Sequence, residues 1–335
     1  YAAVNTVGSC LGILFFTLVG YEMPVWWAIA AIAGVGAHAI GAASSTTTTT
    51  SADGVDRTYW GRDGVVEVFA DGNIHIDGLW HTRLTDGVEH VGHPYTWMMA
   101  FGAVAAHHDR PRNALVIGAG VGISSACLAG VDGIHVDGYE IDHTLKRVLR
   151  DYPAQTLDAL SQPNVRWMWQ DARTGLALNE TRYDVILSAP LYLRQAGSSL
   201  LLSREYLRLV KSRLAPDGVL AVYSNEGSDA QTRLVQATLA DLFAYRVSWY
   251  DGIVTVASDR PITVTPEHLE RVLARPDRLF REARTLDVSL AAQGGLFGLY
   301  DGDRYIGELA DRVITDDQPL VEYPSLADAW VGRAP

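Results

Sequence analysis

Lysine is nearly absent from this chain, and acidic residues outnumber basic ones. Of the 335 residues only Lys146 and Lys211 are lysines, and the net charge is −12. A surface that follows nucleic-acid phosphates needs clustered Lys and Arg, whereas the arginines here are scattered from Arg57 onward. We therefore expect no nucleic-acid partner.

Cysteine is equally scarce, and no metal-ligand pattern is present. The two cysteines, Cys10 and Cys127, have no spacing that suggests a disulfide framework. Several histidines lie near one another in the sequence: His90, His93, His107 and His108. No Cys or carboxylate accompanies them at ligand spacing, so we expect no metal site.

Charge is missing from the first 52 residues, where Glu22 is the single charged side chain. Two apolar runs of nineteen residues flank it, Ala2 to Gly20 and Val25 to Ala43. A helix that spans a bilayer needs about 20 such residues. The sequence therefore predicts two transmembrane helices within residues 1–43, with the lipid bilayer as a partner.

Small residues in both runs predict further membrane helices as neighbours. Gly8 and Gly12 form a G-x-x-x-G motif, and such faces let helices pack closely. The neighbours would come from a missing N-terminal part, since the chain opens on Tyr1 rather than Met, from a second copy, or from a membrane complex. A secretory signal is the competing interpretation, but it would need a basic start and one run rather than two.

We accordingly expect a multi-pass protein of the cell membrane with a cytoplasmic α/β domain. No Lys or Arg precedes Arg57, so the positive-inside rule does not orient the hairpin.

After the hairpin the pattern of residues changes. Residues 44–57, which include five consecutive threonines, are predicted to be a polar linker. Residues 58–94 contain short alternating runs with turns at Asp71-Gly72 and Asp77-Gly78. These signals predict a small antiparallel β-domain.

From residue 95 to 260 strands and helices alternate, which predicts a mostly parallel sheet with helices on both faces. The predicted strands are Ala114–Gly118, Ile134–Glu140, Val165–Gln170, Tyr183–Ser188 and Val219–Ser224. A closing hairpin around Asp251-Gly252 adds an antiparallel strand. This ending is typical of the class I methyltransferase-like, or Rossmann-like, α/β fold rather than of a dehydrogenase. Residues 261–335 are predicted to be a helical and irregular extension that packs against the domain, with Asp316 and Asp317 as exposed turn acids.

The α/β domain begins with the stretch ALVIGAGVGISS, in which Gly118, Gly120 and Gly122 alternate. An apolar run ending in glycines predicts a buried strand that turns sharply into a helix, where the backbone can approach a ligand closely. A dinucleotide fingerprint, G-x-G-x-x-G, would need glycine at Ile123. The observed G-x-G-x-G is instead the usual first loop of S-adenosylmethionine-dependent transferases.

Two acids at later strand ends complete the predicted cofactor site. Glu140, followed by Ile141, ends the second strand, and its carboxylate can accept hydrogen bonds from both ribose hydroxyls. Asp171 follows the third strand and can accept from the adenine amine, while the Ala172 N–H donates to a ring nitrogen. As alternatives, Glu140 is an incidental exposed acid and Asp171 is a helix N-cap.

In combination these motifs resemble the spermidine synthase family of aminopropyltransferases, in particular its membrane-fused bacterial members. The resemblance rests on NTVGSCLG, HIDGLWHTRL, VIGAGVG, GYEID, WQDAR, YDVILSAP, LLLSREYLRLVKSRLAPDGVLAVYS and the tail TDDQPLVEY at Thr315 to Tyr323. It implies S-adenosylmethionine or decarboxylated S-adenosylmethionine as co-substrate, with Glu140 on the ribose and Asp171 on the adenine.

The sequence departs from the family pattern at the positions that carry the reaction. Val121 replaces the acidic residue of the glycine loop, Ala189 replaces the acid after the fourth strand, and Tyr95-Thr96-Trp97 replaces Tyr-His-Glu. A diamine carries two positive charges, and burying it requires paired carboxylates. We therefore expect an acceptor other than putrescine.

Three functions remain open from the sequence. The first is membrane-tethered transfer of an alkyl group to a less cationic acceptor, with Tyr95 and Ser188 as catalytic candidates that orient it. The second is aminopropyl transfer with relocated acids, Asp142 or Glu205. The third is a catalytically inactive subunit of a membrane complex.

Overall fold

The computed structural model describes residues 46–47, 54–85, 95–189, 193, 197–224, 229–249, 254–290, 299–300, 313–317 and 322. These residues fall into two compact units that divide between Thr82 and Arg83. The predicted transmembrane hairpin lies outside the described residues and stays a prediction. Within the described part, no helix has both the length and the apolar character that crossing a bilayer requires.

The first unit is built on a five-stranded sheet with the strands in sequence order. The strands are β1 (Thr46–Thr47), β2 (Val55–Trp60), β3 (Val65–Phe69), β4 (Asn73–Ile76) and β5 (Leu79–Arg83). Alternate residues of β3 point inward, so Val66 and Val68 are buried. The turn before β5 has positive φ at Asp77 and Gly78, as a two-residue hairpin turn requires.

This sheet extends into the predicted linker, residues 44–57. Thr46 pairs with Tyr59 and Thr47 with Thr58 in an antiparallel register. The polar composition predicted a linker, but threonine is β-branched and is favoured in strands. A short edge strand therefore forms there, and β2 begins at Val55.

The second unit contains an eight-stranded mixed sheet with the order β13-β11-β12-β10-β9-β6-β7-β8. The parallel strands are β6 (Asn113–Ile117), β7 (His135–Glu140), β8 (Val165–Trp169), β9 (Tyr183–Ser188) and β10 (Leu214–Tyr223). The antiparallel pairs are made by β11 (Tyr245–Trp249), β12 (Val254–Ser258) and β13 (Leu299–Tyr300). The predicted Rossmann-like, methyltransferase-type α/β fold is confirmed by this arrangement.

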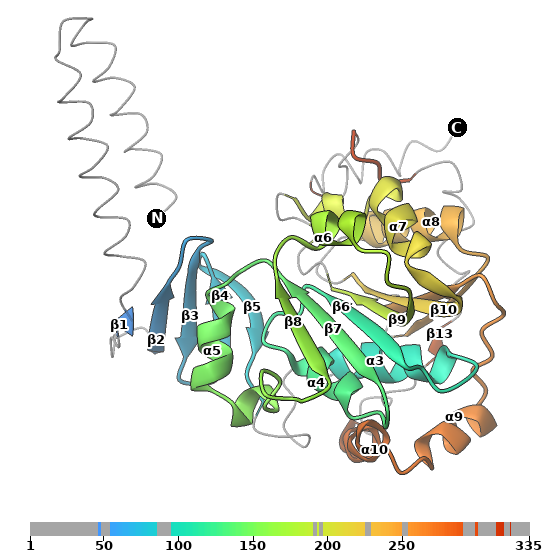
Figure 1. Cartoon of the computed structure of the whole chain (residues 1–335), viewed down its shortest axis with the longest axis horizontal. Coiled ribbons are helices and arrows are strands. Elements are labelled where there is room, and N and C mark those ends of the chain that lie inside the picture. Colours follow the sequence, from blue (N-terminus) through green and yellow to red (C-terminus); the bar gives the residue numbers. More distant parts are fainter. Residues whose placement is uncertain are drawn as a thin grey trace, which may run out of the picture. The chain divides into compact units, whose positions relative to one another are not determined.

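Helices cover both faces of this sheet (Figure 1). One face carries α6 (Ala172–Leu178), α7 (Arg204–Ser212) and α8 (Asp229–Leu242). The other carries α3 (Tyr95–Ala106), α4 (Ile123–Ala129), α9 (Pro266–Leu273) and α10 (Arg278–Leu290). Shorter helices are α5 (Leu145–Asp151), η3 (Ala154–Thr156) and η4 (Ser198–Leu201).

Helix α3 is apolar on all sides because it lies between the sheet and other helices. Its neighbours are β9, β10, β12, α4 and α10. All of its residues except Tyr95 are buried, which is the expected place for a helix without a polar face. Tyr95 is thus left at the start of a tightly packed element.

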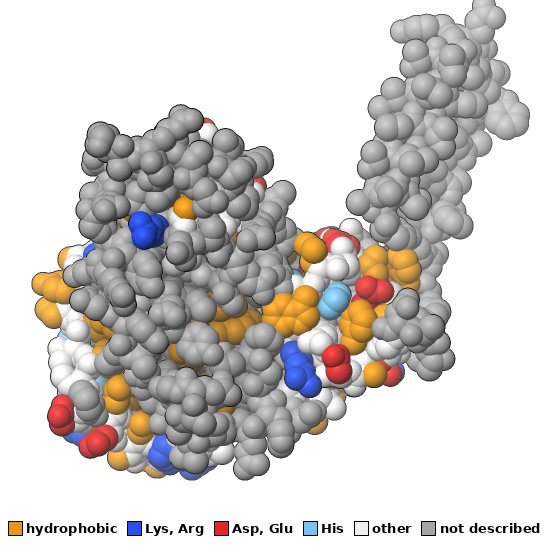
Figure 2. Space-filling view, turned by 180° about the vertical axis from the view of Figure 1, so that it is seen from behind, with side chains coloured by type: hydrophobic (Ala, Val, Ile, Leu, Met, Phe, Trp, Pro, Cys, Tyr) orange, Lys and Arg blue, Asp and Glu red, His pale blue; other side chains and the backbone are white. Residues whose placement is uncertain are grey.

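On the face drawn in Figure 2, the described Lys and Arg side chains lie singly.

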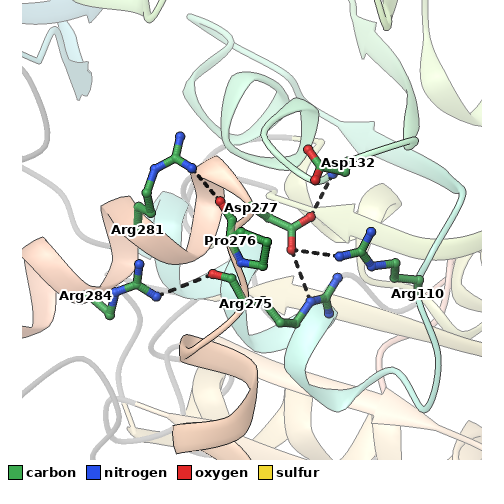
Figure 3. Close-up of polar contacts among 7 residues, drawn as sticks. All are labelled: Arg110, Asp132, Arg275, Pro276, Asp277, Arg281 and Arg284. Atoms are coloured by element: carbon green, nitrogen blue, oxygen red, sulfur yellow. Dashed lines mark hydrogen bonds and ion pairs between the residues drawn. The ribbon is translucent and has the colours of Figure 1, made fainter.

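The extension is fastened to the second unit by Asp277, which precedes α10 (Figure 3). Its carboxylate is fully buried and accepts from the backbone N–H of Asp132 at 2.9 Å, from Arg275 Nε at 3.2 Å and from Arg110 Nη2 at 3.3 Å. Nearby, Arg278 donates to the carbonyl of Ala126 in α4 at 2.6 Å. A buried carboxylate with three donors is a stable connection, because hydrogen bonds to protein donors replace the hydrogen bonds to water that burial removes.

Replacing Asp277 with Asn should lower the free energy of unfolding by about 2–3 kcal/mol, because the mostly buried Arg275 loses its counter-charge. Urea denaturation measures the change. The matched control is Asp109→Asn, since Asp109 is exposed and its side chain makes no ion pair among the described residues. Equal stabilities for the two variants would show that Asp277 does not anchor the extension.

Candidate functional site

The sheet reverses its strand order between β6 and β9. The chain runs from β6 through β7 to β8 on one side and then returns to β9 on the other side of β6. Ligands of open α/β sheets bind outside the carboxyl ends of the strands at such a switch point. Gly118 follows β6 there, and Ala189 follows β9, with the Ala189 N–H donating to the Ile117 carbonyl at 3.2 Å.

The three glycines of the loop after β6 all have positive φ: 69° at Gly118, 55° at Gly120 and 77° at Gly122. A Cβ at Gly118 would lie 3.1 Å from the carbonyl oxygen of Ala189, and one at Gly122 would lie 2.5 Å from the Cβ of Ala159. A Cβ at Gly120 would meet nothing closer than 3.9 Å. Gly118 and Gly122 are therefore required by packing, whereas Gly120 borders open space.

Glu140, at the end of β7, is hydrogen-bonded to this loop. Its side chain is buried, with Oε2 accepting from the Gly120 N–H at 2.7 Å and Oε1 from the Asp142 N–H at 2.8 Å. Burial raises the pKa of the Glu140 carboxyl above its usual range, and the two N–H donors oppose the shift. Each oxygen keeps a second lone pair, so the carboxylate can accept further hydrogen bonds.

The other two residues of the predicted cofactor site, Ile141 and Ala172, differ in exposure. Ile141 is 58% exposed, although it is a large apolar residue directly after a buried strand. Ala172 is buried at the first position of α6, where the backbone N–H has no helical acceptor. An exposed apolar side chain beside a buried carboxylate suits a ligand with a flat apolar ring and a hydroxylated sugar.

Asp171 acts as the N-cap of α6, the alternative role considered from the sequence. Its Oδ1 accepts from the backbone N–H of Thr174 at 2.7 Å. β8 pairs with β7 so that Trp169 lies opposite Glu140, which places Asp171 two residues beyond the strand end at the same edge of the sheet. The cap and a ligand contact are compatible, because a carboxylate has two oxygens.

The two catalytic candidates lie near the ends of neighbouring strands: Ser188 is the last residue of β9, and Tyr95 begins α3 beside the end of β10. Tyr95 stacks on Tyr223, the last residue of β10, with ring centroids 4.1 Å apart. Ser188 ends β9 and pairs with Val222 of β10. The Ser188 side chain is fully buried, and its hydroxyl has no hydrogen-bond partner among the described residues.

The two candidate relocated acids are occupied by backbone hydrogen bonds. Asp142 is buried, and its Oδ1 accepts from the Thr144 N–H at 2.7 Å. Glu205 Oε2 accepts from the Asp316 N–H at 3.0 Å. Both carboxylates therefore have structural tasks. Among the described residues, no group of three or more His, Cys, Asp or Glu side chains is arranged to hold a metal ion.

Two residues of this edge escaped the sequence patterns. Tyr223 supports Tyr95, and Tyr206 of α7 is fully buried with its hydroxyl lacking a partner within the described part of the chain. Burial raises the pKa of Tyr206, and the negative charge of Asp171 adds to the shift. A tyrosine at a core position of an amphipathic helix is a weak signal, because the same pattern is satisfied by simple packing.

No family model matches the chain. Polyamine aminopropyltransferase 2 of Pseudomonas aeruginosa is 26% identical over 151 residues, which is 42% of this chain and 43% of that protein. The alignment thus spans less than half the length of this curated relative.

Solved spermidine synthases share the fold. The enzyme from Thermotoga maritima superposes with a TM-score of 0.52 at 19% identity, covering 65% of this chain and 79% of that one. A probable spermidine synthase from Corynebacterium glutamicum gives 0.55 at 18%, covering 83% and 94%. A spermidine synthase in complex with the transition state analogue AdoDATO gives 0.53 at 18%, covering 68% and 78%.

The strand order and the glycine loop define a Rossmann-like α/β protein of the methyltransferase type. Within that class, the resemblance to the spermidine synthase family is confirmed by the aligned curated relative and by the similar structures.

Substituting the loop glycines with alanine should separate packing from backbone strain. Gly133→Ala is the matched control, because Gly133 has the same φ of 77° as Gly122 and no neighbour closer than 4.0 Å. Strain alone should cost about 1–2 kcal/mol in the control, and overpacking should add roughly 1–3 kcal/mol in Gly122→Ala. Gly120→Ala should cost no more than the control.

Chemical denaturation gives the three free energies of unfolding. A Gly122→Ala protein as stable as Gly133→Ala would contradict the close approach of Gly122 to Ala159.

Proposed function

We propose that this chain is a membrane-anchored, spermidine synthase-like transferase. It binds S-adenosylmethionine or decarboxylated S-adenosylmethionine and transfers an alkyl group from it to an acceptor other than putrescine. The main support for this class of ligand is the environment of Glu140. Its buried carboxylate accepts a hydrogen bond from the glycine loop, and the next residue, Ile141, is exposed. A similar solved structure holds AdoDATO, which supports a related ligand here.

The roles of the site residues follow from this ligand. Glu140 would accept hydrogen bonds from the ribose hydroxyls, and Ile141 would cover one face of the adenine. The Asp171 carboxylate would accept a hydrogen bond from the adenine amine, and the Ala172 N–H would donate one to a ring nitrogen. Gly118, Gly120 and Gly122 let the backbone come close to the ligand. Together these contacts would hold the sulfonium in one orientation.

The reaction would be a displacement at carbon. The acceptor's lone pair forms a bond to the carbon beside the sulfonium, while the carbon–sulfur bond breaks and its electron pair returns to sulfur, leaving a neutral thioether. The positive charge passes to the acceptor atom, which releases its proton to solvent. Alignment of the two reactants supplies much of the rate in such a step. Tyr95 and Ser188 would be the polar residues that orient the acceptor.

The proposed acceptor is supported by two apolar residues, Val121 and Ala189, at the positions where the family has acids. Val121 in the glycine loop is 4% exposed, and Ala189 follows β9 at the switch point. Neither side chain can bind an ammonium group, and burying a dication without a partner is costly. An uncharged or singly charged acceptor fits these residues better than putrescine.

Two other functions have support of their own. Aminopropyl transfer is favoured by the name of the curated relative. A catalytically inactive subunit of a membrane complex is favoured by the structural use of Asp142 and Glu205, the candidate relocated acids.

Isothermal calorimetry with S-adenosylmethionine, its decarboxylated form and methylthioadenosine tests the ligand class. We expect at least one to bind, and Glu140→Ala to weaken binding by about tenfold or more through loss of hydrogen bonds to a charged acceptor. Glu180→Ala is the control, because Glu180 is exposed and lies two residues beyond the C-terminal end of α6. Binding by none of the three would leave the inactive subunit as the function. If at least one binds, product analysis with putrescine decides between the two transferases.

The raised pKa of Glu140 predicts a pH dependence of the same binding. The ribose contacts need the ionised carboxylate, so affinity should be full at neutral pH and fall as the pH drops through the raised pKa. The loss should therefore begin above the pKa of about 4.3 of an ordinary glutamate. Calorimetry across pH 4–8 measures it, and in Glu140→Gln the residual affinity should not vary with pH in this way.

Extraction tests the membrane anchor. Residues 1–43 carry the two apolar runs, so we expect the intact chain to stay with membranes in high salt or carbonate and to be released by detergent. Release by carbonate alone would exclude the transmembrane hairpin.

A further inference from the structure

The C-terminal motif TDDQPLVEY reaches back to the predicted nucleotide edge. Ile314, directly before it, is fully buried. Its carbonyl accepts from the Arg204 N–H at 2.8 Å, and its N–H donates to Thr238 Oγ1 at 2.9 Å. The segment Val313–Asp317 is therefore seated between the start of α7 and α8.

Asp316 makes the strongest contact of this segment. Its carboxylate forms a two-pronged ion pair with Arg173, with Nη1 to Oδ1 at 2.9 Å and a second short contact from Nη2 to Oδ2. The guanidinium lowers the pKa of the Asp316 carboxyl. About a third of each side chain is exposed, and a planar fork of this kind fixes direction as well as distance.

Glu322 fastens the motif at a second point. Its Oε1 accepts from the backbone N–H of Gly197 at 2.9 Å, from that of Ser199 at 3.0 Å and from the Ser199 hydroxyl. These donors lie at the start of η4, the turn that leads into α7. The two acids of one motif thus hold α6 and η4.

Arg173 connects the tail to the site. It is the second residue of α6, two residues after Asp171, and its guanidinium lies 6.0 Å from the centre of the Tyr206 ring. The ion pair with Asp316 and the tyrosine ring together restrict its position. Since Asp171 caps the same turn through the Thr174 N–H, the direction of the Asp171 carboxylate depends on that turn.

We propose that Asp316 is a positioning residue for the nucleobase: by holding Arg173 it fixes the first turn of α6 and therefore the Asp171 carboxylate that accepts from the adenine amine. This inference rests on the proposed adenosyl ligand. A purely structural tail would also make the ion pair, but it would have no influence on which base is preferred.

The test compares methylthioadenosine with methylthioinosine, in which a carbonyl oxygen replaces the exocyclic amine. The wild-type protein should prefer the adenine compound. Asp316→Asn should weaken methylthioadenosine about fivefold, the size of one net hydrogen bond, while leaving methylthioinosine unchanged. Asp317→Asn is the matched control, because the adjacent Asp317 is exposed and has no hydrogen bond or ion pair within the described residues.

Two further variants distinguish the positioning role from a folding defect. Arg173→Lys keeps the charge but loses the fork, and it should reduce the adenine preference in the same way. Asp316→Glu, which keeps a carboxylate, should retain most of the adenine preference. Thermal denaturation of every variant identifies any loss that comes from unfolding.

The outcomes separate the two proposals. If the wild-type protein binds neither compound, the adenosyl ligand and this inference both fail. If it prefers methylthioadenosine and Asp316→Asn keeps that preference, or loses affinity for both compounds equally, the ligand stands and the positioning role of Asp316 is wrong.

Discussion

The site depends on one carboxylate that bonds to backbone on two sides. Glu140 joins the glycine loop after β6 to the turn after β7 through the N–H groups of Gly120 and Asp142. The backbone adds a second connection, because the Ala119 N–H donates to the Tyr139 carbonyl at 2.9 Å. A buried acid is costly unless its oxygens accept hydrogen bonds, and here each turn supplies one N–H donor to Glu140. A ligand that adds hydroxyl donors would complete the set.

The scarcity of lysine has a structural counterpart. Arginine makes several ion pairs with buried or partly buried carboxylates: Arg166 with Asp137, Arg173 with Asp316, and Arg110 and Arg275 with Asp277. In the first two pairs both ends of the guanidinium fork are used. Lysine cannot replace it there, because an ammonium group is a point charge without a preferred plane. In this chain many basic residues hold sequence-distant segments together.

Local patterns predicted the strands of the second unit and the sharp glycine turn after β6 well. The strand Tyr183–Ser188 has the predicted bounds, because an apolar run flanked by polar residues has little freedom to shift. β10 begins at Leu214 rather than Val219. The intervening Ala-Pro-Asp-Gly has the composition of a turn, but the strand continues through it with a shift in its pairing register with β9. The stack of Tyr95 on Tyr223 and the ion pair of Arg173 with Asp316 join residues more than a hundred positions apart. No periodicity records such contacts, so they became visible only in the structure.

The path of the tail has a consequence for the order in which the protein is made. Ribosomes release a chain from its N-terminal end, so β6, β7 and α6 emerge well before the segment that contains Asp316 and Glu322. The parallel sheet can assemble while Arg173 is still without its carboxylate partner. The first turn of α6, where Arg173 lies, is therefore among the last parts of the second unit to reach its final form, and a chain that stalls late in synthesis would carry this turn without its ion pair to Asp316.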